Sequence, residues 1–125
     1  MASIFKLLSL ILFFGFIFKG DALYCSSGKN IIIKQSRTGN WAHGMPEWKV
    51  RITNKCVCAQ SQVKLKCDGF RTYKYVDQSI LQISGDVCLL KKGQSIYPFQ
   101  TVEFLYAWDP QFPFQLISSQ EICDS

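Results

Sequence analysis

Six cysteines constrain the fold of this chain more than any other feature of its sequence. They are Cys25, Cys56, Cys58, Cys67, Cys88 and Cys123. Three of them fall in the stretch from Asn54 to Cys67 (NKCVCAQSQVKLKC), which ends in a basic, alternating run. Cysteines in such a pattern indicate disulfide bonds in an oxidising compartment and metal or redox chemistry in a reducing one. The compartment therefore has to be established first.

The N-terminus predicts a secretory signal peptide at residues 1–22. Lys6 is followed by the apolar run LLSLILFFGFIF, and the small residues Gly20 and Ala22 stand just before the expected cleavage site. A basic start, a short apolar core and a small-x-small site are the parts of such a peptide. A membrane anchor is the alternative, but a spanning helix needs roughly 20 apolar residues. We therefore expect cleavage after Ala22 and a secreted, extracellular domain at residues 23–125.

In that compartment, an even number of cysteines in a short chain predicts a disulfide framework, for which six cysteines allow 15 pairings. Zinc is the alternative for Cys56, Cys58 and Cys67, but zinc knuckles usually space their ligands C-x₂₋₄-C. Here Val57 alone separates the first two. The C-x-x-C motif of a thiol–disulfide oxidoreductase is also absent. We predict no bound metal, six oxidised cysteines, and different partners for Cys56 and Cys58, because a bond between those two would close only a tiny loop.

Period-two alternation of apolar and polar residues predicts an all-β fold. The expected strands are residues 31–35, 48–54, 63–67, 101–108 and 114–118. In WKVRITN, for example, the apolar side chains face one side of the strand and the polar side chains face the other. The turn sequences TGNWAHGMP, KKGQS and DPQFP separate these runs. This pattern favours one small antiparallel β-sandwich, and VDQSILQIS is the one candidate for a helical turn or two.

The aromatic residues divide into a predicted core set and one exposed residue. Phe104, Tyr106 and Trp108 alternate along one expected strand, so we predict that they are core residues rather than a carbohydrate-binding platform. We expect Trp41 to lie beside His43 in a loop bounded by glycines. We expect Trp41 to be exposed and available to a partner.

Alternation also predicts a basic face. If strands 48–54 and 63–67 form a hairpin through the short connection between them, four cations share one solvent face: Lys49, Arg51, Lys64 and Lys66, with Lys55 at its end. Like charges on paired strands repel, so this face has a modest cost and suits an acidic partner. A solvated face that keeps the chain soluble is the alternative. A nucleic-acid partner is not expected, because the chain lacks a recognition helix and a glycine–aromatic pattern.

The sequence lacks the residue clusters of common hydrolases. His43 is the single histidine, and no serine motif flanks it. A glycosidase needs two carboxylates across a cleft, whereas the candidate carboxylates are scattered: Glu47, Asp68, Asp77, Asp86, Glu103 and Asp109. We therefore expect a protein that is not an enzyme and needs no cofactor.

Several ordered motifs span nearly the whole expected mature chain. The most specific are I-x-N-x-C at Ile52–Cys56, D-x-C-L at Asp86–Leu89 and F-x-Y-A at Phe104–Ala107, with a Cys-Asp-Gly-Phe turn at Cys67–Phe70. In this order they resemble the plant Tapetum Determinant-like proteins. These are small secreted proteins, and the founding member is an extracellular ligand for a leucine-rich-repeat receptor kinase that fixes cell identity in the anther.

The resemblance implies a secreted, cysteine-rich ligand in the apoplast that binds a leucine-rich-repeat receptor kinase ectodomain and acts in cell fate or reproductive development. The family has no established catalytic residues, so the resemblance implies none here. The alternative is a wall- or defence-associated module that binds acidic polysaccharide through Trp41 and the basic face. The residues expected to contact a partner are Lys49, Arg51, Lys64, Lys66 and Trp41.

Overall fold

A computed structural model describes Cys25 and residues 30–123. The predicted signal peptide, residues 1–22, lies outside the described residues. The elements, in chain order, are β1 (Ile31–Ala42), β2 (Met45–Asn54), β3 (Ala59–Lys66), β4 (Leu81–Ser84), β5 (Val87–Leu90), the 3₁₀ turn η2 (Lys91–Gly93), β6 (Thr101–Ala107) and β7 (Gln115–Ile122). Within this part of the chain, no helix is long and apolar enough to cross a membrane.

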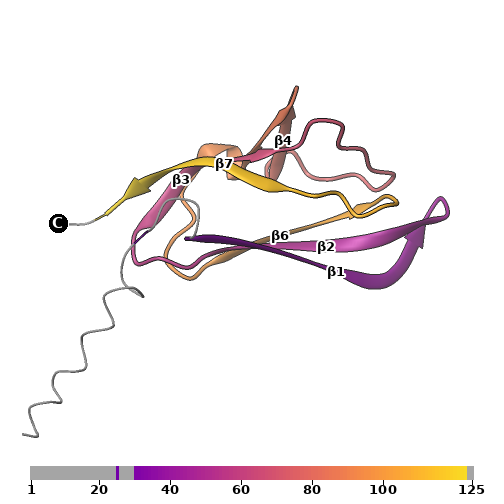
Figure 1. Ribbon diagram of the computed structural model, residues 1–125, viewed down its shortest axis with the longest axis horizontal. Helices are drawn as coiled ribbons and strands as arrows, with labels where there is room; N and C mark the ends of the chain where they lie inside the picture. Colours follow the sequence, from indigo (N-terminus) through magenta and orange to yellow (C-terminus); the bar gives the residue numbers. More distant parts are fainter. Residues whose placement is uncertain (1–24, 26–29, 124–125) are drawn as a thin grey trace, which may run out of the picture.

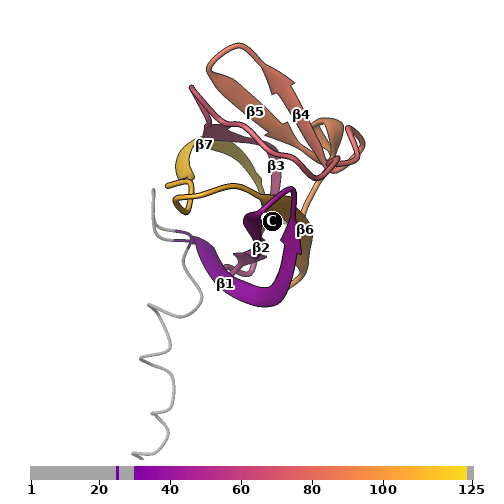
Figure 2. The same ribbon diagram turned by 90° about the vertical axis from the view of Figure 1, so that its right-hand side faces the viewer.

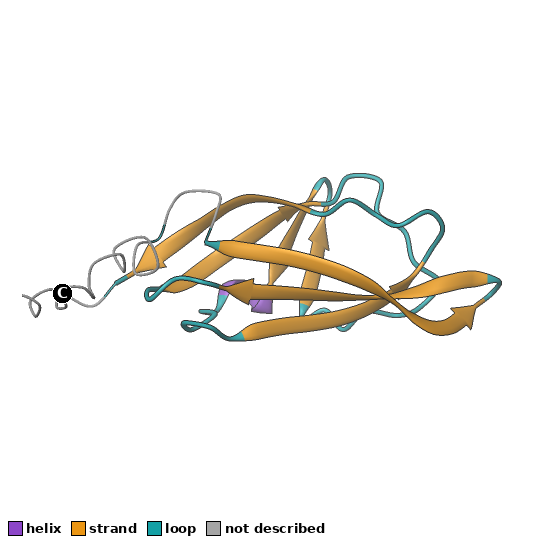
Figure 3. Ribbon diagram, turned by 60° about the horizontal axis from the view of Figure 1, so that its bottom comes forward, coloured by secondary structure: helices purple, strands orange, loops and turns teal. Residues whose placement is uncertain are grey.

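The strands form two antiparallel sheets. One sheet has the order β1-β2-β6 and the other has the order β4-β5-β3-β7. The two sheets lie as separate layers, one over the other (Figures 1 and 2). Figure 3 shows how little of the described chain is helical. The predicted all-β antiparallel sandwich is confirmed.

The core lies between the two sheets, where alternate residues of each strand point inward. Val50 and Ile52 of β2 are fully buried, as are Val63 and Leu65 of β3. Tyr106 of β6 joins the same apolar cluster. Burying one such side chain stabilises the fold by about 1.5–3 kcal/mol relative to leaving it in water. The apolar residues that alternate with polar ones in the sequence are therefore the residues that form this core.

The predicted hairpin between the second and third strands is wrong. β2 pairs with β1 and β6, whereas β3 pairs with β5 and β7. Residues 55–58 therefore cross from one sheet to the other. The Asn54 side chain organises this crossover: its Nδ2 donates to the carbonyl oxygens of Cys58 (2.9 Å) and Ile96 (2.8 Å), and its Oδ1 accepts from the backbone N–H of Cys56 (3.0 Å).

The crossover divides the predicted basic face into two. Lys49 and Arg51 lie on the sheet β1-β2-β6, and Lys64 and Lys66 lie on the other sheet. Because the apolar residues of β2 and β3 both point into the core between the sheets, their basic residues point away from the core in opposite directions. The four cations therefore do not share one surface.

Two further segments differ from the sequence-based expectation. The segment VDQSILQIS is not helical: Ile80 and Leu81 donate their backbone N–H groups to the Asp77 carbonyl oxygen in one turn, after which the chain enters β4. β4 and β5 form a hairpin that the sequence pattern did not predict. Each of these strands has only four residues, the shortest length over which alternation indicates a strand.

All six cysteines form disulfide bonds, as predicted. The pairs are Cys25–Cys56, Cys58–Cys123 and Cys67–Cys88. The prediction that Cys56 and Cys58 have different partners is also confirmed. The first two bonds meet at the crossover between the sheets, where they attach the beginning of the described chain and the end of β7. The third joins the segment after β3 to β5 within one sheet.

Candidate functional site

The first candidate surface is the outer face of the sheet β1-β2-β6. We call it the cationic face and define it by Lys34, Lys49, Arg51 and Lys55. Lys34 and Arg51 are direct cross-strand neighbours. The Nε of Arg51 lies 2.8 Å from a carboxylate oxygen of Glu103 on β6, so one of the four cations is partly neutralised.

A shallow groove of about 280 Å³ runs over this face. Its lining combines three cations with two hydroxyl groups and one apolar side chain: Lys34, Arg51, Lys55, Thr53, Thr101 and Ile32. The hydroxyl oxygens of Thr53 and Thr101 lie 2.8 Å apart and form a hydrogen bond. Cations beside hydroxyl groups suit an anionic ligand that also offers hydrogen-bonding groups.

The second candidate surface lies around the tip of the β1–β2 hairpin, where all three tryptophans of the chain gather. We call it the aromatic end and define it by Arg37, Trp41, His43, Trp48, Tyr73 and Trp108. Trp41 is 62% exposed, as predicted. It lies on β1 itself rather than in a loop, because the turn comprises only His43 and Gly44. Both turn residues have positive φ (52° and 78°), as a two-residue hairpin turn of type I′ requires.

Two stacks of side chains build the aromatic end. In the first, the guanidinium carbon of Arg37 lies 5.2 Å from the ring centre of Trp41 and 5.4 Å from that of Trp48. These distances are within the range of cation–π attraction. In the second, Tyr73 stacks on Trp108 with ring centres 5.4 Å apart.

Further contacts extend and connect the two stacks of the aromatic end. The ring of His43 lies 5.1 Å from that of Tyr73. The indole Nε1 of Trp48 donates to the backbone oxygen of Trp108 over 3.0 Å, which joins the first stack to the second. Trp108 is only partly buried, so the prediction that it belongs to the core holds for Phe104 and Tyr106 but not fully for Trp108. Trp108 lies one residue beyond the end of β6 at Ala107.

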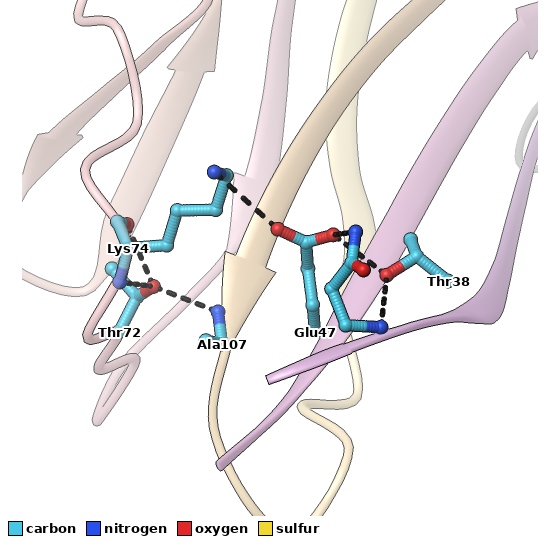
Figure 4. Close-up of polar contacts among 6 residues, drawn as sticks. Thr38, Glu47, Thr72, Lys74 and Ala107 are labelled. Carbon is cyan, nitrogen blue, oxygen red and sulfur yellow. Dashed lines mark hydrogen bonds and ion pairs between the residues drawn. The ribbon is translucent and has the colours of Figure 1, made fainter. Parts of the chain in front are cut away.

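A buried carboxylate anchors the aromatic end. One oxygen of Glu47 accepts hydrogen bonds from the Thr38 hydroxyl (2.6 Å) and the Asn40 amide (3.2 Å), and the other lies 3.3 Å from the Lys74 ammonium. Figure 4 shows this carboxylate between Thr38 and Lys74. The Thr38 hydrogen bond is the main reason that the pKa of Glu47 lies below 4.5, although burial acts in the opposite direction. Glu47 therefore links the β1–β2 hairpin to the segment that carries Tyr73.

That segment is attached to the end of β6 as well. The hydroxyl oxygen of Thr72 accepts from the backbone N–H of Ala107 (3.0 Å), and the backbone N–H of Tyr73 donates to the Ala107 oxygen (2.9 Å). The Thr72 hydroxyl also accepts from the Lys74 N–H over 3.0 Å (Figure 4). Three segments distant in sequence therefore hold one another in place beneath the exposed rings.

Tyr106 holds the loop that follows β6. Its hydroxyl donates to Gln35 Oε1 (2.5 Å) and accepts from the Phe112 backbone N–H (2.8 Å), while Gln35 Nε2 donates to the Phe112 oxygen (2.6 Å). Burial raises the pKa of Tyr106 to about 12. The hydroxyl therefore stays protonated at any physiological pH and acts as a structural donor.

Several of the residues considered for catalysis or metal binding have other roles in the structure. His43 packs on Tyr73, Glu103 pairs with Arg51, and Asp77 accepts two hydrogen bonds from Ser79, which lower the pKa of Asp77. The sulfur atoms of Cys25, Cys56 and Cys58 lie within 4.8 Å of one another. Both disulfides there consume the thiolates, and thiolates are what zinc needs.

The fold and its surfaces define a small disulfide-bonded β-sandwich with a rigid aromatic end and a cationic face. Residues 27–123 match the family described as Tapetum determinant 1, C-terminal, and the chain belongs to this family. The resemblance inferred from the cysteine and aromatic motifs is thereby confirmed.

Curated proteins of rice and Arabidopsis are similar to this chain. The chain is 29% identical to TPD1 protein homolog 1A of Oryza sativa subsp. japonica over 108 residues, which cover 79% of this chain and 47% of that protein. It is 28% identical to TPD1 protein homolog 1 of Arabidopsis thaliana over 95 residues, which cover 74% and 53%. The chain thus spans about half the length of the curated relatives it matches. No solved structure matches it.

Proposed function

We propose that this protein is a secreted, cysteine-rich signalling ligand that binds the ectodomain of a leucine-rich-repeat receptor kinase. Its setting is plant cell-fate or reproductive development, in the anther and tapetum. Membership of the Tapetum determinant 1 family over residues 27–123 carries this proposal. The predicted signal peptide at residues 1–22 supports it, because it would deliver the chain to the apoplast.

The three disulfides and the two packed sheets also support a role as a ligand. Disulfides persist in oxidising, extracellular surroundings, and all six cysteines are paired. A rigid domain loses little conformational freedom when it binds, which leaves more of the contact energy for affinity. A ligand of this kind acts through its surface and needs no reaction centre.

The full chain, expressed in plant cells and collected from the medium, tests the proposal. N-terminal sequencing of the secreted protein should begin at Leu23. We expect saturable binding to at least one member of a panel of immobilised leucine-rich-repeat receptor kinase ectodomains, measured by biolayer interferometry. Protein that has been reduced and alkylated serves as the control and should lose binding. Retention of the chain inside the cell, or no binding to any ectodomain, would contradict the proposal.

The groove on the cationic face favours a second candidate function, binding of acidic polysaccharide. Lys34, Arg51 and Lys55 line it beside two threonine hydroxyl groups, and uronate polymers offer carboxylates next to hydroxyl groups. De-esterified pectin and a neutral glucan, run as additional arms of the same assay, distinguish the two functions. Binding to pectin alone would favour the polysaccharide module over the receptor ligand.

A further inference from the structure

The aromatic end has the composition of a protein-binding surface. Trp41 is 62% exposed and Tyr73 is 49% exposed, and Tyr75, two residues further along, is 78% exposed. Tryptophan, tyrosine and arginine are the residues most enriched among those that dominate protein–protein affinity. Here the guanidinium of Arg37 lies over the rings of two of the tryptophans, Trp41 and Trp48.

The guanidinium of Arg37 is oriented but has no polar partner in the described part of the chain. The ion pairs there join Arg51 to Glu103 and Lys74 to Glu47, and no side-chain hydrogen bond engages Arg37. The guanidinium carbon lies 5.2 Å from the ring centre of Trp41 and 5.4 Å from that of Trp48. Its N–H donors, which match a carboxylate in a bidentate fork, are therefore not engaged by any described residue.

The surface is also held in place before any partner arrives. Glu47 attaches the hairpin to the segment that carries Tyr73, and Thr72 attaches that segment to the end of β6. Such preorganisation lowers the entropy lost on binding. Isolated exposed rings elsewhere, such as Tyr97, lack a comparable set of stacking partners among the described residues.

We propose that the aromatic end is the surface through which this protein contacts its receptor, with Arg37 receiving a receptor carboxylate that is surrounded by apolar side chains. This inference rests on the proposed function, since it names the contact surface of the ligand. The cationic face, which continues along the same β1–β2 hairpin, steers the approach of an acidic ectodomain without forming the centre of the contact.

Three substitutions test the inference against an ectodomain that binds the wild-type protein. Trp41→Ala and Arg37→Ala should each weaken affinity by about tenfold or more. Arg37→Lys should also weaken it, because the ammonium keeps the charge but loses the planar fork. Since both side chains are exposed, the melting temperatures of the variants should stay close to that of the wild type.

Tyr97→Ala provides the matched control. Tyr97 is a similarly exposed ring (57%), in the segment whose backbone bonds to Asn54 at the far end of β2 from the hairpin tip. The affinity of this variant for the ectodomain should stay within about twofold of the wild-type affinity, as expected for a residue outside the central contact.

The possible results separate the two proposals. If the wild-type protein binds no ectodomain of the panel, the proposed function falls and the contact surface falls with it. If the wild type binds and Trp41→Ala and Arg37→Ala bind equally well, only the aromatic end is excluded. If these two variants still bind the ectodomain but no longer bind de-esterified pectin, the aromatic end is a polysaccharide site and the inference is overturned.

Discussion

Glu47 illustrates how one residue can hold together segments that are far apart in the chain. Its side chain is almost completely buried, yet it remains charged because Thr38, Asn40 and Lys74 supply three polar contacts. A buried carboxylate without such partners would be costly. Because the partners come from β1 and from the segment after Phe70, the contacts of this one carboxylate connect the two segments.

Replacing Glu47 by Gln should lower the free energy of unfolding by about 1–2 kcal/mol at pH 7, since hydrogen bonds to a charged acceptor are lost. The folded protein holds the pKa of Glu47 below 4.5, so the unfolded chain binds a proton first as the pH falls. The stabilisation is therefore complete near neutral pH and is lost as the pH falls below 4.5 through the folded-state pKa. Urea unfolding at pH 7, 5 and 3 measures this convergence of variant and wild type.

Glu103→Gln is the matched control for this measurement. The Glu103 side chain is 45% exposed in its pair with Arg51, and exposed pairs contribute roughly 0–1 kcal/mol. Equal losses in the two variants, or a Glu47→Gln deficit that stays constant down to pH 3, would show that Glu47 is not the anchor.

At the same scale, the sequence predicts single exposed residues better than it predicts their partners. The glycine-bounded segment correctly indicated an exposed Trp41. Arg37 was not identified, because its contact with Trp41 depends on a register irregularity of β1 between these two residues. Tyr73 was not identified either, since its stacking on Trp108 joins residues whose proximity no local pattern encodes.

At the scale of elements, alternation identified which residues face the core but not which strands are neighbours. The five expected strands all exist, with β1, β2, β3 and β7 longer than expected. A short connection usually joins strands that pair, which made a β2–β3 hairpin the natural prediction. The buried amide of Asn54 instead bonds across the crossover to Cys58 and Ile96. Local sequence patterns do not predict this contact, because Asn54 and Ile96 are far apart in the chain.

Removing the Cys58–Cys123 disulfide by a double substitution to serine should reduce the free energy of unfolding by about 2–5 kcal/mol. The bond spans 65 residues, so the unfolded chain gains considerable freedom without it. In the native state, the effect should stay local: hydrogen exchange should quicken at Gln120–Ile122 and remain slow at Tyr73 and Ala107. Fast exchange at Tyr73 would contradict the independence of the aromatic end from this bond.

At the scale of the whole molecule, the sandwich distributes its cations over the outer faces of two different sheets. The chain has a formal net charge of +5. Lys34 and Lys49 lie on the sheet that forms the aromatic end, whereas Lys64 and Lys66 lie on the opposite sheet. Charge changes on the two sheets therefore test which of them faces an acidic partner.

Two double charge reversals exploit this geometry. Lys34→Glu with Lys49→Glu should slow association with an acidic ectodomain severalfold at low salt and weaken the salt dependence of the rate, because such charges act through steering. Lys64→Glu with Lys66→Glu alters the net charge by the same amount on the other face, and should slow association much less. Both variants should unfold at nearly the wild-type temperature, since surface charges contribute little to stability. Stopped-flow association at several ionic strengths compares them.

Equal slowing by the two variants would mean that net charge alone governs the encounter. Greater slowing by the Lys64 and Lys66 reversal would place the partner on the sheet β4-β5-β3-β7.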